Sequence, residues 1–235
     1  FRQALNYAVN KQEIVDTLFG GFGAAAVNGV THPFLCENDG GDPVYQYDLA
    51  KAKSLIDEAR AEGAPVDDVI KLYAPNDRYV LDKETGEAVL GYWKAAGLNV
   101  EYYPQSRSVL FPLALRSFTE YKADIDGPFL IGNGNGLGRA EFPYELWLEN
   151  KDGGRGRAFA SPHPASWEED LDKARLLASC SDESKALLAK MNKDVVDFAP
   201  WVFLVNFNDL YGVSDEIEWR PWSTEIRMLY EVDLR

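Results

Sequence analysis

The chain has 235 residues, of which 46% are hydrophobic and 26% charged, so it can bury the core of an ordinary globular protein. Its formal net charge of −14 argues against nucleic acid and anionic membrane surfaces as partners, because such a protein repels phosphate groups. No apolar run approaches the roughly 18 residues that a bilayer-spanning helix needs.

The first part of the sequence predicts two helices followed by a long irregular segment. Apolar residues recur on one helical face within residues 1–9, and Asn10 with Glu13 forms a capping-box pattern for the second helix. The Gly20–Gly21 pair is typical of a helix end. Residues 20–47 are rich in Gly, Asn, Asp and Pro, and irregular segments of this length are usually functional or held in place by another part of the chain.

Helices and short strands alternate through the rest of the sequence. Asp48 is predicted to cap a helix that ends near Gly63, and Ser181 to cap a helix late in the chain. Such alternation implies an α/β layer with a largely parallel sheet. The patterns predict strands at 69–75, 98–103, 123–131 and 201–207, and helices at 77–96, 107–120, 143–150, 167–179 and 182–198.

The stretch LIGNGNGLGRAEF, residues 130–142, places four glycines in seven positions, and we call residues 132–138 the glycine loop. A dinucleotide fingerprint needs glycines at offsets 0, +2 and +5, but Leu137 occupies the last offset from Gly132. No Lys-Ser/Thr pair follows, so the loop does not match a P-loop either. Phosphate binding is therefore not predicted.

Metal binding and hydrolysis are not predicted either. His32 and Cys36 stand four apart, but Pro33 argues against a continuous helical face, and His163 lies between two prolines. No nucleophile-elbow motif is present. Asp124 and Asp126 share one face of a predicted strand and could form a glycosidase-like pair, but a solvated or capping role is favoured. We therefore predict no catalytic residue, no metal and no cofactor.

The two cysteines, Cys36 and Cys180, are too few for a disulfide scaffold. They could form one bridge in an oxidising compartment or remain two unrelated thiols. The sequence leaves both alternatives open.

A binding surface is the remaining interpretation of the glycine loop. The loop follows the carboxyl end of a predicted strand, where open α/β sheets bind ligands. Bare backbone, two amides and an aromatic border suit an uncharged polar ligand. The candidate ligand-binding residues here are Phe129, Ile131, Asn133, Gly134, Asn135, Arg139 and Phe142.

Several stretches resemble one family in the same order along the chain. The opening FRQALNYAVNKQEIVDTLFGGFGAAA resembles the extracellular solute-binding proteins of family 5. YQYDLAKAKSLIDEA and GYWKAAGLNVEYY are similar to two further segments of that family. WEEDLDKARLLASCSDESKALLAKMNKDVVDFAPWVFLVNF is similar to its closing helical pair and strand.

The resemblance implies a fold and a role. Members are two-lobed receptors of ABC importers for peptides, nickel and some oligosaccharides, and this chain resembles their C-terminal half. Residues 1–210 would form the C-terminal lobe of a type II periplasmic-binding-protein-like clamshell, with a mostly parallel sheet flanked by helices. Residues 211–235 would return toward the missing N-terminal lobe. The implied partners are a small solute and the permease transmembrane subunits, in the periplasm or outside the cell, with or without a lipid anchor.

The glycine loop departs from the family pattern. There the corresponding loop often reads Trp-x-x-Asp-x-x-Asp-Pro, and its acidic residue can anchor a peptide's amino terminus. Residues 131–135 of this chain lack that Asp-Pro pair, and an amide cannot form the charge-assisted bond of a carboxylate. Asn133 and Asn135 therefore favour a saccharide or another neutral polar solute, whereas Arg107 and Arg139 could instead accept a carboxylate. A sensor without transport and a saccharide hydrolase are the alternative functions.

Overall fold

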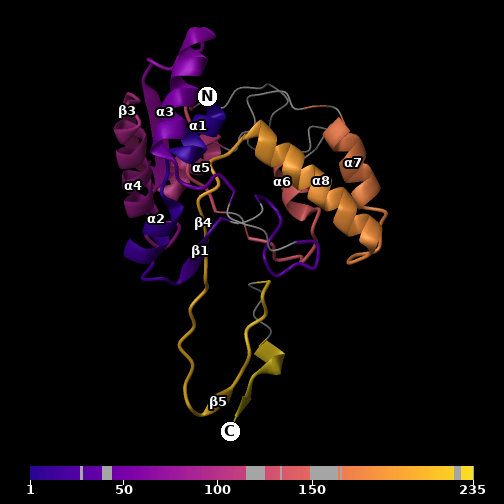
Figure 1. Ribbon diagram of the computed structural model, residues 1–235. Helices are drawn as coiled ribbons and strands as arrows, with labels where there is room; N and C mark the ends of the chain where they lie inside the picture. Colours follow the sequence, from indigo (N-terminus) through magenta and orange to yellow (C-terminus); the bar gives the residue numbers. More distant parts are fainter. Residues whose placement is uncertain are drawn as a thin grey trace.

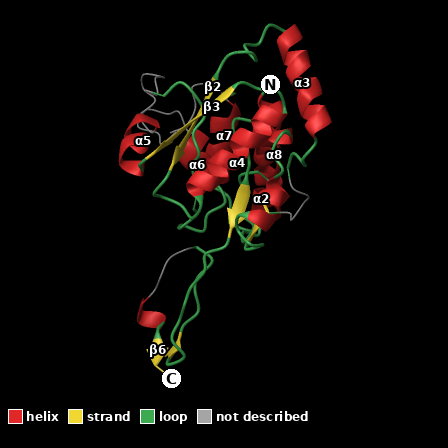
Figure 2. Ribbon diagram, turned by 90° about the vertical axis from the view of Figure 1, so that its left-hand side faces the viewer, coloured by secondary structure: helices red, strands yellow, loops and turns green. Residues whose placement is uncertain are grey.

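A computed structural model describes residues 1–26, 29–38, 44–114, 125–132, 134–148, 164, 166–224 and 229–234. Helices and strands form two hydrophobic clusters, and an extended tail projects away from both (Figures 1 and 2). No helix within the described ranges combines the length and apolar character needed to cross a membrane.

The first cluster surrounds a short parallel sheet. Its helices are α1 (Arg2–Tyr7), α2 (Lys11–Thr17), α3 (Leu49–Ala61) and α4 (Asp82–Ala95), and α5 (Arg107–Ala114) follows the sheet in sequence. Strands β2 (Ile70–Pro75) and β3 (Val100–Gln105) pair in parallel, with Ile70 opposite Val100. Trp93 of α4 is 1% exposed in the centre of this cluster, and its indole N–H donates to the Leu5 carbonyl at 3.1 Å.

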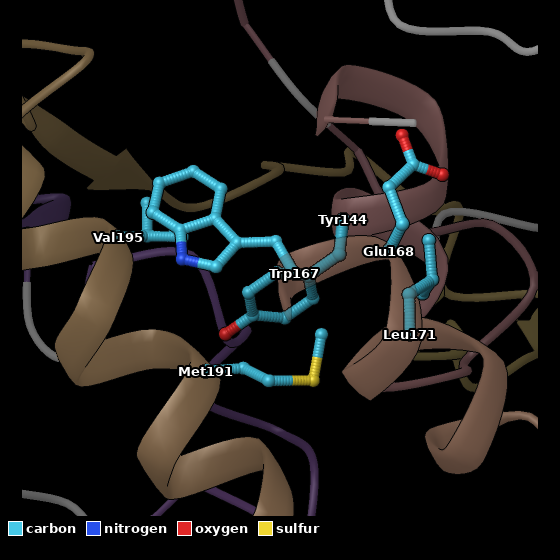
Figure 3. Close-up of a pocket in the computed structure, with 6 residues that line it drawn as sticks. All are labelled: Tyr144, Trp167, Glu168, Leu171, Met191 and Val195. Atoms are coloured by element: carbon cyan, nitrogen blue, oxygen red, sulfur yellow. The ribbon is translucent and has the colours of Figure 1, made fainter. Parts of the chain in front are cut away.

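The second cluster is mainly helical. It contains α6 (Phe142–Leu148), α7 (Ser166–Ala174) and α8 (Asp182–Phe198), the last two lying side by side (Figure 1). Tyr144, Trp167 and Met191 face one another across these helices (Figure 3). They border a cavity of about 10 Å³, which is room for about one water molecule.

The two clusters are joined by contacts between distant parts of the chain. Strand β1 (Gly23–Ala25) pairs antiparallel with β4 (Val205–Phe207). The buried amide of Asn6 donates to the Trp201 carbonyl at 2.8 Å and accepts the Phe203 N–H at 3.0 Å. Because Asn6 is fully buried, these bonds fix α1 against the segment that leads into β4.

The tail begins after β4 and carries β5 (Ile217–Glu218), the 3₁₀ turn η2 (Leu229–Glu231) and β6 (Asp233–Leu234). β5 and β6 pair antiparallel at the end of the tail farthest from the two hydrophobic clusters (Figure 2). Large apolar side chains are exposed along the tail, including Leu210, Tyr230 and Leu234. Such exposure is typical of a surface that another part of a protein covers.

The predicted α/β class is confirmed, and so are the predicted helix caps. The side chains of Asn10, Asp48 and Ser181 each accept a backbone N–H in the first turn of their helices. Parallel pairing occurs between β2 and β3 and continues as a bridge between Tyr73 and Phe129. The other two strand pairs in the described ranges are antiparallel.

Some predicted boundaries were wrong. The helix predicted from residue 77 begins at Asp82, because its carboxylate accepts the N–H groups of Arg78 and Tyr79 and holds the preceding residues in a turn. The strand predicted at 201–207 is confined to β4, and β1 lies inside the segment predicted to be irregular. The helix predicted to reach residue 179 ends at Ala174.

Two further predictions fall partly beyond the described residues. The helix predicted at 107–120 is seen as α5, and residues 115–120 lie outside the described ranges. The strand predicted at 123–131 begins with two residues outside those ranges, and its remainder makes the single bridge at Phe129.

Candidate functional site

The candidate site lies at one edge of the parallel sheet. Strands β2 and β3 run in the same direction, and the extended residues 128–130 join them beside β2. Tyr73 accepts the Leu130 N–H at 2.8 Å and donates its own N–H to the Pro128 carbonyl at 2.9 Å. The segments after these three stretches, residues 76–80, residues 106–107 and the glycine loop, therefore meet at the edge where α/β sheets bind ligands.

Tyr79 packs directly on the glycine loop. A Cβ atom at residue 132 would lie 2.8 Å from the Tyr79 ring, so only glycine fits there without displacing the ring. The Tyr79 hydroxyl donates to the Gly132 carbonyl at 3.2 Å. Burial raises the pKa of the Tyr79 phenol, and the positive charges of Arg78 and Arg107 act in the opposite direction. The Arg78 guanidinium lies over the Tyr79 ring, and the Arg107 N–H donates to Asp77 at 2.6 Å, which holds residue 107 beside the segment that carries Tyr79.

Asn135 closes the other end of the loop. It is 1% exposed, and its amide donates to the Arg139 carbonyl at 2.8 Å and accepts the Arg139 N–H at 3.3 Å. Gly138, whose φ is +63°, donates its N–H to the Asn135 carbonyl. The polar atoms of Asn135 are thus used within the loop, an inward orientation that sequence spacing did not indicate.

The arginines near the site differ in their partners. Arg139 is paired with Glu141 at 2.7 Å and with Glu145 at 3.1 Å, at the start of α6. Arg78 and Arg107 are exposed and lie over the Tyr79 and Phe111 rings, 4.8 and 5.6 Å from the ring centroids. Their backbone N–H groups donate to the carboxylates of Asp82 and Asp77, but within the described part of the chain neither guanidinium group is paired with a carboxylate. Of the two arginines predicted to accept a carboxylate, Arg139 is already paired, so Arg107 is the one whose guanidinium group is available to a solute. Arg78, which was not predicted, offers a second such guanidinium group.

The remaining predicted ligand-binding residues occupy different positions. Phe129 forms the bridge to β2, and Ile131 packs against the second cluster. Gly134 and Phe142 are half-buried on either side of the Asn135 turn. Asn133 lies outside the described residues. Contact of these residues with a solute stays a prediction.

The tail also reaches the glycine loop. A Cβ at Gly138 would lie 3.3 Å from the Thr224 methyl group, and one at Gly136 would lie 3.8 Å from the Thr224 carbonyl oxygen. The glycines of the loop therefore face two neighbours. Gly132 packs against Tyr79 at one end, and Gly136 and Gly138 lie beside the tail at the other end. Sequence reasoning missed Tyr79, Arg78 and Thr224, although the position of the first two directly after a strand was a usable signal.

The geometry gives no support to hydrolysis by the Asp124–Asp126 pair. Lys71 and the Tyr73 hydroxyl donate to Asp126 and hold its pKa below the ordinary value, whereas a glycosidase acid needs a raised pKa. Asp124 lies outside the described residues, as does His163. The cavity in Figure 3 lies in the second cluster and is far below the roughly 300 Å³ of a small-molecule site.

The cysteines form a disulfide, which settles the alternative that the sequence left open. Cys36 and Cys180 are bonded with their Cα atoms 5.5 Å apart and 144 residues apart in sequence. The bond ties the segment 29–38 to the turn between α7 and α8.

Comparison with known families gives one match, to the model described as "Bacterial extracellular solute-binding proteins, family 5 Middle", over residues 1–155. The dipeptide-binding protein of Escherichia coli (strain K12) is 34% identical over 105 residues, which cover 43% of this chain and 18% of that protein.

Solved structures show a similar fold. The ABC transporter substrate-binding protein CtaP from Listeria monocytogenes superposes with a TM-score of 0.76 at 18% identity, covering 99% of this chain and 46% of that one. The oligopeptide-binding protein AppA from Bacillus subtilis, in complex with a nonapeptide, has a TM-score of 0.76 at 16% identity and covers 100% and 47%. The chain thus spans less than half the length of these relatives. Their fold is that of type II periplasmic binding proteins.

Proposed function

Because the chain belongs to the bacterial extracellular solute-binding proteins of family 5, we propose that it supplies one lobe of the receptor of an ABC importer. Residues 1–210 form the lobe, and residues 211–235 return toward an N-terminal lobe. The exposed apolar side chains of the tail support this division, because a second lobe would cover them. The family match over residues 1–155 is the observation that carries the proposal.

The receptor works by capture without chemistry. The two lobes close on a solute by a hinge motion, and the closed form is presented to the permease transmembrane subunits. Only contacts that are absent from the open form favour closure. The lobe supplies such contacts from the edge beyond β2 and β3, where Arg78, Arg107 and the glycine loop lie together.

We place the protein in the periplasm or outside the cell, with or without a lipid anchor. Proteins of this family are extracellular or periplasmic. The Cys36–Cys180 disulfide supports this location, because such bonds persist in oxidising compartments.

A solute with a carboxylate, of the peptide class, fits the site better than a neutral saccharide. The amide of Asn135 is occupied within the loop, which removes one of the two groups that favoured a saccharide. Arg78 and Arg107 present guanidinium groups without a carboxylate partner in the described residues. A planar guanidinium binds a carboxylate through two parallel hydrogen bonds.

The test is isothermal calorimetry on the full-length parent protein. Peptides of two to five residues with a free carboxyl terminus are compared with the same peptides amidated at that terminus, and with neutral oligosaccharides. We expect the free peptides to bind. Amidation of the peptide or Arg107→Gln should weaken the affinity about 10- to 100-fold, because each removes one charged hydrogen-bonding contact. Arg60→Gln is the matched control, because this exposed arginine on α3 is paired with Asp57 and Asp67.

The outcomes separate the two parts of the proposal. Saccharide binding that Arg107→Gln leaves unchanged would refute the carboxylate assignment and keep the receptor function. A parent protein that binds none of the peptides or saccharides offered would count against the receptor function itself. An equal loss of affinity in Arg60→Gln would show that overall charge, not contact, is responsible.

A further inference from the structure

The disulfide is flanked by a buried carboxylate. Cys36 and Cys180 are both exposed, whereas Glu37, the residue after Cys36, is 6% exposed. The three residues bring two sulfur atoms and a carboxylate oxygen within 4.8 Å of one another. Cys180 lies in the turn that connects α7 to α8, and Cys36 and Glu37 lie in the segment 29–38 that the disulfide ties to this turn.

One oxygen of Glu37 holds the two sides of the disulfide together without involving sulfur. Its Oε1 accepts the Cys180 N–H at 2.8 Å and the hydroxyl groups of Ser179 and Ser184 at 3.2 and 3.3 Å. Because Ser184 lies in the first turn of α8, the carboxylate also benefits from the positive end of the helix dipole. None of these bonds involves a sulfur atom, so reduction of the disulfide removes none of their donors or acceptors.

The other oxygen of Glu37 faces sulfur. Its Oε2 lies 3.2 Å from Cys36 Sγ, and a disulfide sulfur has no proton to donate. Within the described ranges no N–H or O–H group donates to Oε2. A buried carboxylate oxygen without a donor is costly, and a cation placed between it and the sulfur atoms removes that cost.

We propose that reduction of Cys36–Cys180 converts this cluster into a binding site for a thiophilic divalent cation such as Zn²⁺. The two thiolates and Glu37 Oε2 supply three ligands, and water completes a tetrahedral shell. Zinc–sulfur bonds of about 2.3 Å require the sulfur atoms to separate to about 3.8 Å. Both cysteines are exposed, whereas Glu37 is held by three hydrogen bonds, so the separation of the sulfur atoms requires movement of the cysteines and not of the carboxylate.

The chemistry balances with a dithiol as reductant. The dithiol transfers two electrons and two protons to the disulfide and becomes a cyclic disulfide, leaving two protein thiols. Binding of the cation then releases the two thiol protons to the buffer. In an oxidising compartment the disulfide persists and the site stays closed, so the cation is bound only where a reductant reaches the exposed bond.

The experiment compares the oxidised chain with chain reduced by a dithiol and freed of it by gel filtration without oxygen. Zn²⁺ is titrated against a chromophoric chelator, and Co²⁺ absorption reports thiolate ligation. We expect one equivalent of Zn²⁺ on the reduced chain and none on the oxidised chain. Glu37→Gln should weaken binding at least about tenfold, the lower bound for loss of an outer-shell partner. Cys36→Ser/Cys180→Ser should abolish it, and Glu58→Gln, an exposed change on α3, should have no effect.

Three results would overturn the proposal. The first is a reduced chain that binds no more Zn²⁺ than the double serine variant. The second is Glu37→Gln binding as tightly as the unaltered reduced chain, which would indicate two thiolates without the carboxylate. The third is loss of the far-ultraviolet helical signal on reduction, because the proposal requires the folded turn to hold both cysteines.

Discussion

Alanine substitutions at Gly86 and Gly91 should change stability in opposite directions, although both residues lie in α4. Gly91 is exposed, and a Cβ added there meets no atom within 4 Å. Gly86 is buried, and a Cβ there would lie 2.5 Å from the Tyr102 hydroxyl oxygen and 2.7 Å from its ring. The same chemical change therefore occurs once in open space and once against a packed aromatic side chain.

The magnitudes follow from these contacts. Gly91→Ala should raise the free energy of unfolding by about 1 kcal/mol, because alanine is the better helix former. Gly86→Ala gains the same term but must displace Tyr102, whose hydroxyl donates to the Lys83 carbonyl at 2.9 Å. Overpacking costs about 1–3 kcal/mol and the lost hydrogen bond about 0.5–1.5 kcal/mol. We expect Gly86→Ala to be destabilised by about 1–3 kcal/mol.

Urea unfolding of the 235-residue chain, followed by circular dichroism, measures both changes against the unaltered protein. The two midpoints should move apart while the slope with urea stays constant, since a changed slope would indicate a different unfolded or native state. In thermal unfolding each kcal/mol should shift Tm by about 2–4 °C. A Gly86→Ala protein as stable as Gly91→Ala would refute the packing of Tyr102 on α4.

Three further predictions concern affinity, pH and the loop. The chain alone should bind the parent protein's solute at least about 100-fold more weakly than the parent does, because one lobe makes only part of the contacts; calorimetry giving equal affinities would contradict this. Burial lowers the pKa of Lys11 to about 7 in the folded chain. Between pH 7 and about 10 the unfolded chain therefore binds more protons at this lysine than the folded chain does, so the free energy of unfolding should rise with pH over that range. Urea midpoints across that range should show the rise in the unaltered chain and lose it in Lys11→Met. Asn135→Ala should cost about 1–3 kcal/mol of stability by leaving the Arg139 backbone unpaired. Unchanged stability with lost solute affinity would instead assign Asn135 to the solute.

Local features of this fold could be predicted from the sequence. The caps at Asn10, Asp48 and Ser181 depend on residues three positions apart, so the pattern alone contains both partners. The family could likewise be identified from ordered motifs. The start of α4 was predicted five residues too early. The Asp82 carboxylate binds the N–H groups of Arg78 and Tyr79 on its N-terminal side, and the apolar periodicity of the sequence does not reveal these bonds.

The site was only partly predictable, because its contacts join distant residues. The position of the glycine loop at the ligand-binding edge of the sheet could be predicted, because the loop directly follows a predicted strand. The inward orientation of Asn135 and the Glu141 and Glu145 partners of Arg139 depend on how the loop turns into α6. Tyr79 meets Gly132 from 53 residues away, and the cysteines pair across 144. No sequence pattern specifies such pairings.

The hydrogen bonds between Asn6 and the segment that leads into β4 affect the order of folding. The Asn6 partner Trp201 lies 195 residues further along the chain, and Arg2 and Gln3 bind Phe198 and Asp197 over similar separations. During synthesis α1 therefore leaves the ribosome long before the residues that complete its surroundings. Until they arrive, α1 can pack against α3, but the side chains of Arg2, Gln3 and Asn6 lack their hydrogen-bond acceptors. Contacts of such long range also slow folding, because the chain must close a large loop before they form.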